Sequence, residues 1–117
     1  MELSADQKPR YASDQILQTD LSNLPGQEVL IFASIWQPGV TLPWHIHPNG
    51  HEFTFVIDGE QTFEIDGVGT KVVRAGEVCY VPPNVTHFGR NATDSISKTL
   101  VVRIKPKGEP TMVEMKR

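Results

Sequence analysis

Short β-like runs separated by glycine and proline turns constrain the fold of this sequence most. No stretch of the 117 residues shows an apolar period of 3.6 residues with helix caps over three turns. Alternating or wholly apolar segments are instead interrupted by turn signals, as at residues 38–39, 59–60 and 75–76. The expected strands span residues 15–21, 28–37, 52–58, 61–66, 70–74, 77–81, 86–91, 95–105 and 111–115. This series predicts an all-β jelly roll of two antiparallel sheets.

Two of the expected strands need cover on both faces. Residues 28–37 carry apolar side chains at odd and even positions, and residues 95–105 form a long segment rich in β-branched side chains. A strand with one face in water carries apolar side chains on its other face only. Apolar side chains on both faces therefore indicate that these two segments are buried on both sides. Because a small barrel does not supply that cover internally, we expect the chain to form a homodimer.

Length and charge limit the domain organisation and the partners. A chain of 117 residues holds one core, so we expect a polar arm over residues 1–13 and a single domain over residues 14–117. The net charge is −3, and the cationic residues form no stripe except near the C-terminus, which argues against a nucleic-acid partner. The longest mostly apolar run, residues 29–36, is too short to cross a bilayer, so no membrane partner is expected.

The compartment follows only weakly from the sequence. Cys79 is the only cysteine, which excludes an internal disulfide, and its apolar neighbours predict a buried thiol. Residues 1–10 lack the apolar segment of a signal peptide. We therefore expect a cytoplasmic protein on the sequence as it stands, or a periplasmic one if an export signal has been removed.

Three of the four histidines lie within seven residues, at positions 45, 47 and 51. Residues two apart in a strand project from one face, so His45 and His47 can reach one point in space. Glu52 starts the next β-like segment, and a closed or sandwiched sheet would bring the distant His87 alongside. Imidazole suits first-row divalent ions, and a carboxylate shifts the preference toward harder ions. His51 has the opposite strand parity from Glu52, so we expect it to be an ordinary exposed histidine.

The spacing of these residues resembles the two sequence motifs of the cupin superfamily. The first motif is matched without a gap by Gly39, His45, His47, Glu52 and Gly59. The second is matched by Gly76, Pro82, His87 and Asn91, with Asn84 where the family pattern prefers glycine. Asparagine is the commonest non-glycine residue at positive φ, so this departure is compatible with the motif. The two motifs and their spacer cover residues 39–91, nearly half of the chain.

The resemblance implies a double-stranded β-helix with four ligands to a divalent transition metal ion, His45, His47, Glu52 and His87. Iron, manganese, nickel, copper and zinc all remain open as the metal. Four protein ligands on an ion that accepts six would leave positions for water, substrate or dioxygen. Asn91 also matches the motif, and its expected role is to hold a turn. Strand parity leaves open whether Thr54, Tyr80, Arg90 and Arg103 face the barrel interior.

Cupin barrels host dioxygenases, isomerases, lyases, decarboxylases and binding or storage proteins, so the fold does not choose the function. The leading hypothesis is a metal-dependent enzyme with dioxygenase-type chemistry on a small oxygen-bearing organic substrate. In it Glu52 is a metal ligand first and a proton acceptor second. A metal-dependent isomerase or lyase is a close alternative. A non-catalytic module that binds a metal or a small molecule, or senses one, is the alternative from another class.

Overall fold

The computed structural model describes residues 11–116, which fold into ten strands without a helix. The strands are β1 Tyr11–Asp20, β2 Gln27–Trp36, β3 His45–Ile46, β4 His51–Asp58, β5 Glu60–Ile65, β6 Gly69–Arg74, β7 Val78–Val81, β8 His87–Arg90, β9 Ser97–Pro106 and β10 Val113–Glu114. The prediction of an all-β fold is confirmed. Within this part of the chain, no helix is long and apolar enough to span a membrane.

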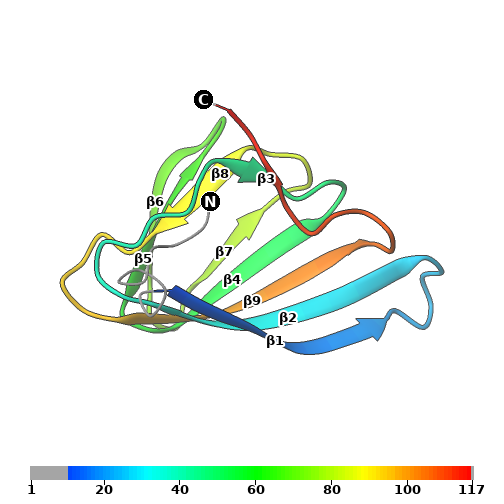
Figure 1. The fold of residues 1–117 in the computed structure, drawn as a ribbon, viewed down its shortest axis with the longest axis horizontal. Coiled ribbons are helices and arrows are strands. Elements are labelled where there is room, and N and C mark those ends of the chain that lie inside the picture. The colour runs from blue at the N-terminus through cyan, green and yellow to red at the C-terminus, as the bar shows by residue number, and fades with distance from the viewer. Residues whose placement is uncertain (1–10, 117) are drawn as a thin grey trace.

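The strands form two antiparallel sheets, as predicted, and each sheet has five strands. One sheet has the order β1-β2-β9-β4-β7 and the other the order β10-β3-β8-β5-β6. In Figure 1, β3 and β8 of the second sheet lie above β4 and β9 of the first. Most neighbouring strands in each sheet are distant in sequence. In the first sheet β9 lies between β2 and β4, and in the second β8 lies between β3 and β5. This arrangement brings β3, β4 and β8 together although residues 59–86 separate β4 from β8.

Apolar and polar side chains occupy different parts of the interior. The apolar cluster consists of Val56, Phe63, Ile65, Val73, Cys79 and Val81, with Val85 packed against it. The Cys79 thiol is buried as expected, and this desolvation raises its pKa to about 11. Buried polar residues, among them His45, His47, Glu52 and His87, occupy the interior between β3, β4 and β8. The apolar cluster thus supports one part of the barrel and leaves the other part for a polar site.

β1 differs from its predicted extent of residues 15–21. β1 is a full partner of β2 from Tyr11 to Asp20, so its first three residues belong to the sheet rather than to the expected arm over residues 1–13. The rest of that arm, residues 1–10, lies outside the described residues. A register shift between Gln15 and Leu17 explains the irregular alternation that made this strand hard to see.

The hairpin at Gly59 requires glycine. Its φ is +80°, and an added Cβ would lie 2.8 Å from the backbone oxygen of Ile96. Both the left-handed conformation and this close approach exclude a larger residue. The turn therefore fixes where β4 ends and β5 begins, and with it the register of Glu52 on β4.

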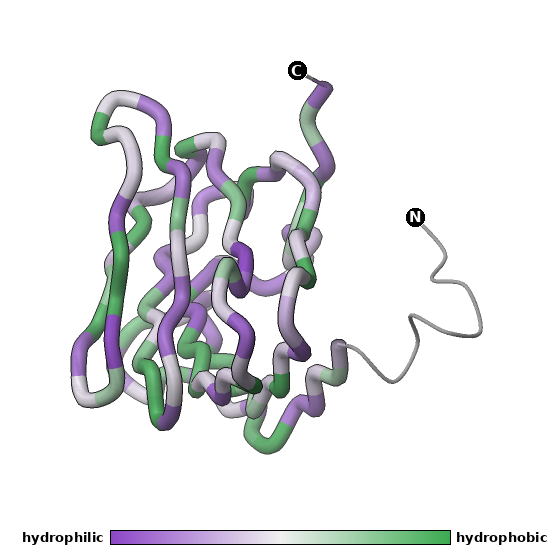
Figure 2. Tube along the Cα trace, turned by 90° about the vertical axis from the view of Figure 1, so that its left-hand side faces the viewer, coloured by the Kyte–Doolittle hydropathy of each residue, from purple (hydrophilic) through white to green (hydrophobic). Residues whose placement is uncertain are grey.

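The outer face of the first sheet is largely apolar. Figure 2 shows hydrophobic and hydrophilic residues alternating along the strands, but on this sheet the outward positions are often hydrophobic too. The exposed large apolar side chains there include Ile35, Phe53, Phe55, Ile57, Val78 and Tyr80. Phe53 lies opposite Tyr80 on β7 and Val102 on β9, so these side chains form a continuous patch. A contiguous apolar patch on a sheet is typical of an association surface.

We expect this patch to form the interface of the homodimer that the sequence predicts. Light scattering at micromolar concentration should give twice the protomer mass of 13.1 kDa. Phe55→Glu places a charge in the middle of the patch and should shift the protein to the monomer, because an unpaired charge is costly in an apolar interface. Val72→Glu, at a similarly exposed position on β6 of the other sheet, is the matched control. A monomeric wild-type protein, or equal effects of the two substitutions, would contradict this prediction.

Candidate metal centre

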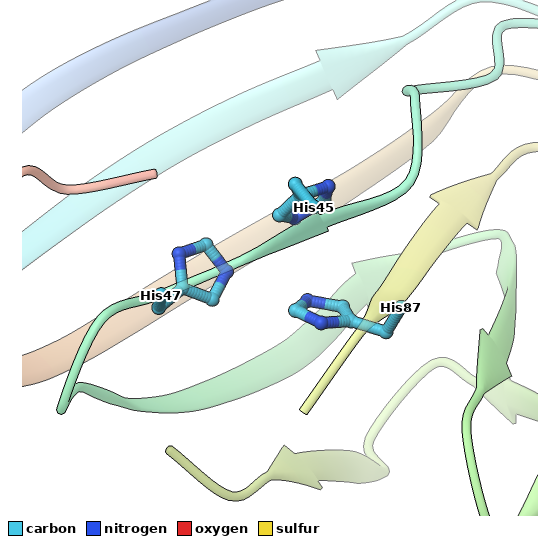
Figure 3. Close-up of side chains that lie close together, drawn as sticks. All are labelled: His45, His47 and His87. Atoms are coloured by element: carbon cyan, nitrogen blue, oxygen red, sulfur yellow. The ribbon is translucent and has the colours of Figure 1, made fainter. Parts of the chain in front are cut away.

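Three histidines converge inside the barrel. His45 on β3 and His87 on β8 are direct cross-strand partners, and His47 follows β3 by one residue. All three are buried, and one ring nitrogen from each lies within 4.8 Å of the other two. Figure 3 shows the three rings close together between β3 and β8. The sequence prediction that these residues meet is confirmed, although the regular strand carrying His45 and His47 is only two residues long.

Hydrogen bonds to backbone carbonyls orient each ring. Nδ1 of His45 lies 2.7 Å from the Pro43 oxygen, and Nδ1 of His87 lies 2.9 Å from the Val85 oxygen. Nδ1 of His47 lies 2.7 Å from the Thr111 oxygen, which comes from the segment before β10. A carbonyl only accepts, so each Nδ1 carries the proton and each neutral ring presents the lone pair of Nε2. This is the tautomer that a metal-binding histidine with a backbone partner adopts.

Glu52 of β4 faces this cluster and is buried. Its Oε1 lies 3.1 Å from Nε2 of His47, and its Oε2 lies 3.1 Å from Nε2 of His87. With Nδ1 protonated, a hydrogen bond between His87 and Glu52 needs a second proton on the ring. Nε2 of His47 is fully buried and has no hydrogen-bond partner in residues 11–116. Without added protons, these contacts set lone pairs against carboxylate oxygens, so a cation bound among them resolves the conflict.

The local electrostatics favour the forms that bind a metal. Burial lowers the pKa of His45 to about 4, which keeps its ring neutral near pH 7. Burial alone raises the pKa of Glu52, but His47, His87 and Arg103 lower it by more, and the net pKa lies well below its usual value. Neutral imidazole and ionised carboxylate are the ligand forms of these side chains. The residues present therefore fit a divalent ion.

Two asparagines join the loops beside the candidate ligands His47 and His87. Asn49 and Asn84 have positive φ values of 53° and 65°, in agreement with asparagine standing where the cupin motif prefers glycine. The Asn49 backbone nitrogen donates to Oδ1 of Asn84 at 2.9 Å, and Nδ2 of Asn84 donates to Oδ1 of Asn49 at 3.2 Å. These bonds tie the loop after His47 to the loop before His87. The positive φ of Asn84 is predictable from the sequence, whereas this side-chain role is not.

Of the other candidate residues, two lie at the cavity and two do not. Thr54 and Arg103 line the cavity beside His45, whereas Tyr80 points outward and Arg90 is not among the lining residues. His51 also faces outward, with Nδ1 2.7 Å from the Tyr80 hydroxyl and its ring stacked on that of Tyr80. The predicted alternation of His51 and Glu52 is therefore observed.

Asn91 holds a turn, as expected. Its Nδ2 donates to the backbone oxygens of Trp36 and Ser95, at 3.0 and 2.7 Å. Its Oδ1 accepts from the backbone nitrogen and the hydroxyl of Thr93. These bonds fix the loop between β8 and β9 and place Asn91 outside the group of candidate ligands.

The cavity at the cluster is small. Its volume is about 30 Å³, and its lining residues are Tyr11, Trp36, Leu42, His45, Glu52, Thr54, Phe63, His87, Gly89, Val101 and Arg103. This volume accommodates an ion or a water molecule. A second, mostly apolar cavity of about 220 Å³ shares Tyr11 and Leu42 with the first. Tyr11 and Leu42 thus line both cavities.

Comparison with known proteins matches the chain to one family model, described as Cupin domain, over residues 33–103. Oxalate oxidase 1 of Hordeum vulgare is 33% identical over 86 residues, which cover 65% of this chain and 43% of that protein. Polyketide synthase CurC of Streptomyces cyaneus is 30% identical over 73 residues, which cover 62% of this chain and 46% of that protein. The matched region is less than half the length of these relatives.

Solved structures share the fold over nearly the whole chain. Oxalate oxidase in complex with the substrate analogue glycolate aligns with a TM-score of 0.70 and 26% identity, over 97% of this chain and 60% of that one. The DMSP lyase DddQ from Ruegeria pomeroyi aligns with a TM-score of 0.74 and 22% identity, over 97% of this chain and 55% of that one. At 22% identity, the similarity to DddQ concerns the fold alone.

We expect the metal-free protein to lose stability as the pH falls. The pKa of His45 is about 4 in the folded state and 6.5 in its ordinary range, so the unfolded chain binds a proton first. The stability from keeping His45 neutral is present above pH 6.5 and is lost as the pH falls to about 4, by about 3 kcal/mol. Urea unfolding with a chelator at several pH values measures this loss. His45→Gln should flatten the dependence and His51→Ala should leave it unchanged; a flat wild-type profile would contradict the assignment.

Substitutions should separate the cluster from its neighbour on β4. Loss of a residue that only supports a metal ligand typically weakens metal binding about 10- to 100-fold. Glu52→Gln and His87→Ala should weaken it by more than this. His51→Ala should keep metal near the wild-type stoichiometry, because His51 faces the outside of the sheet. Elemental analysis after dialysis against a competing chelator measures the occupancy. Loss of metal from His51→Ala with retention in Glu52→Gln would mean that the ligand set is wrong.

Proposed function

The chain belongs to the cupin family, and on this premise we propose that it is a metal-dependent enzyme with dioxygenase-type chemistry on a small, oxygen-bearing organic substrate. His45, His47 and His87 would hold the ion through Nε2, and Glu52 through a carboxylate oxygen. The observation that carries the proposal is the buried cluster of three Nε2 lone pairs beside an ionised carboxylate, with one of these nitrogens lacking a partner among the described residues. A divalent ion bound there would supply Lewis acidity and open coordination positions.

The chain's own residues would bind and shield the substrate. Both oxygens of Glu52 contact an imidazole. An oxygen freed from one of these contacts would accept a proton from a substrate hydroxyl. The Thr54 hydroxyl lies on the same face of β4, two residues along, and is buried. Apolar lining from Trp36, Phe63 and Val101 would exclude bulk water, which strengthens the local electrostatic interactions.

One of the relatives supports oxidative chemistry without fixing the substrate. The barley relative is named an oxalate oxidase and exceeds 30% identity over most of this chain. Because the aligned region covers only 43% of that protein, its substrate is not transferred to this chain. The adjoining cavity of about 220 Å³ would accommodate the part of a substrate that extends past Tyr11 and Leu42.

A second candidate, a metal-binding module without turnover, is favoured by the small inner cavity. About 30 Å³ beside the histidines holds an ion or a water molecule but no organic molecule as the side chains stand. In this alternative the bound ion stabilises the barrel, or the protein senses the supply of metal by binding it. An ion that binds the folded state and not the unfolded state raises the free energy of unfolding by mass action alone.

Metal analysis followed by oxygen uptake separates the two candidates. The protein is purified without added ions, its metal is identified, and oxygen consumption is measured with a panel of diols, enols and phenols. Iron or manganese with substrate-dependent oxygen uptake, lost in His87→Ala, is the expected result. Tight zinc without turnover across the panel would favour the binding module. Absence of any bound metal after reconstitution would overturn both.

A further inference from the structure

Arg103 is the one cationic residue among those that line the inner cavity. It lies on β9 directly opposite Glu52 in the sheet register, so both side chains project into the barrel. Its guanidinium lies over the Phe32 ring, with 5.0 Å between Cζ and the ring centroid. A cation–π contact of this kind restrains the guanidinium. The side chain is 17% exposed, so Arg103 is both positioned and accessible.

The hydrogen bonds of Arg103 leave part of its binding capacity unused. Nε and Nη2 donate to the same oxygen, Oε1 of Glu52, at 3.2 and 3.1 Å. Within residues 11–116, Nη1 donates no hydrogen bond. A guanidinium offers five N–H donors in a planar fork that matches a carboxylate with two oxygens. Arg103 therefore has the donors to bind a second carboxylate beside Glu52.

The charges of the site favour an anionic ligand. The three neutral imidazoles contribute nothing, and the charges of Glu52 and Arg103 cancel. The other lining residues are uncharged. With a divalent ion the loaded site would thus carry two positive charges in a largely buried space. Such a charge is costly unless negative groups compensate it, so a small anion would bind better than a neutral molecule of the same shape.

We propose that Arg103, which is partly exposed, binds the carboxylate group of a small anionic substrate. The side chains that line the inner cavity would move apart to admit it, because the cavity volume of about 30 Å³ holds only an ion or a water molecule as they stand. The inference rests on the proposed function and deepens it by naming the substrate class: a small organic acid with a further oxygen atom available to the ion. Phe32 restrains the guanidinium through the cation–π contact. The N–H donors of the guanidinium are shared between Glu52 and the substrate carboxylate. Arg103 is a substrate-binding residue in this proposal, in addition to its contact with Glu52.

The competing interpretation is that Arg103 only positions Glu52. Under that interpretation, substitution of Arg103 would alter metal content and have no separate effect on anion binding. Glycolate and ethylene glycol are suitable probes, because they differ in the carboxylate while both carry a hydroxyl group. Arg74→Met removes one positive charge from an exposed position on β6 and serves as the matched control.

Calorimetric titration of Mn²⁺-loaded protein tests the proposal. Wild type and Arg74→Met should bind glycolate more tightly than ethylene glycol, and Arg103→Met should bind glycolate about 10- to 100-fold more weakly, as expected for loss of charge-assisted hydrogen bonds. Metal content is measured in parallel. Unchanged glycolate affinity in an Arg103→Met protein that retains its metal would overturn the proposal.

A metal-free experiment decides the remaining cases, including loss of metal from Arg103→Met or failure of the wild type to bind metal. Glu52→Gln removes the counter-ion of Arg103 while keeping the shape of the side chain. Metal-free Glu52→Gln should bind glycolate, and Glu52→Gln/Arg103→Met should bind it at least about 10-fold more weakly. Equal binding by the two variants, or binding by neither, would overturn the role of Arg103 without bearing on the metal site.

Discussion

The buried carboxylate of Glu52 is the constraint on which the rest of the site depends. An ionised carboxylate removed from water costs several kcal/mol unless opposite charge and hydrogen bonds compensate it. Arg103 supplies one compensating charge across the strand pair β4–β9. Two imidazole nitrogens approach its oxygens from the opposite sheet. Glu52 thus links the two sheets electrostatically at a place where the apolar cluster does not reach.

The same interior holds a second buried ion pair, in which a buried carboxylate is again neutralised by a cationic side chain of β9. Nζ of Lys105 lies 2.7 Å from Oε2 of Glu28, and Gln18 also donates to that carboxylate. Hydrogen bonds from Lys105 and Gln18 lower the pKa of Glu28. Lys105 also donates to the backbone oxygens of Pro106 and Glu109, which attaches the segment leading to β10. Both pairs follow alternate positions of β9, so one strand provides the cations for two buried carboxylates.

The sequence predicted the features that depend on local rules. Turn residues marked the strands, alternation separated Glu52 from His51, and motif spacing brought His87 to the cluster. The length of β1 was missed because a bulge breaks its alternation. The distinction between Arg103 and Arg90 needed the register of β9 and β8, which only the paired sheets define. The Thr111 carbonyl that orients His47 could not be predicted, since every residue carries such an oxygen and only tertiary structure selects one.

Because the hydrogen-bond acceptors of the three histidines are backbone oxygens, the orientation of the rings tolerates amino-acid substitutions at the acceptor positions. All three histidine rings are oriented by main-chain oxygens, at positions 43, 85 and 111. A point mutation replaces a side chain and leaves its carbonyl in place, so the ring tautomers are protected against most substitutions at these positions. Residues around the three histidines can therefore change while the backbone keeps the orientation of the rings.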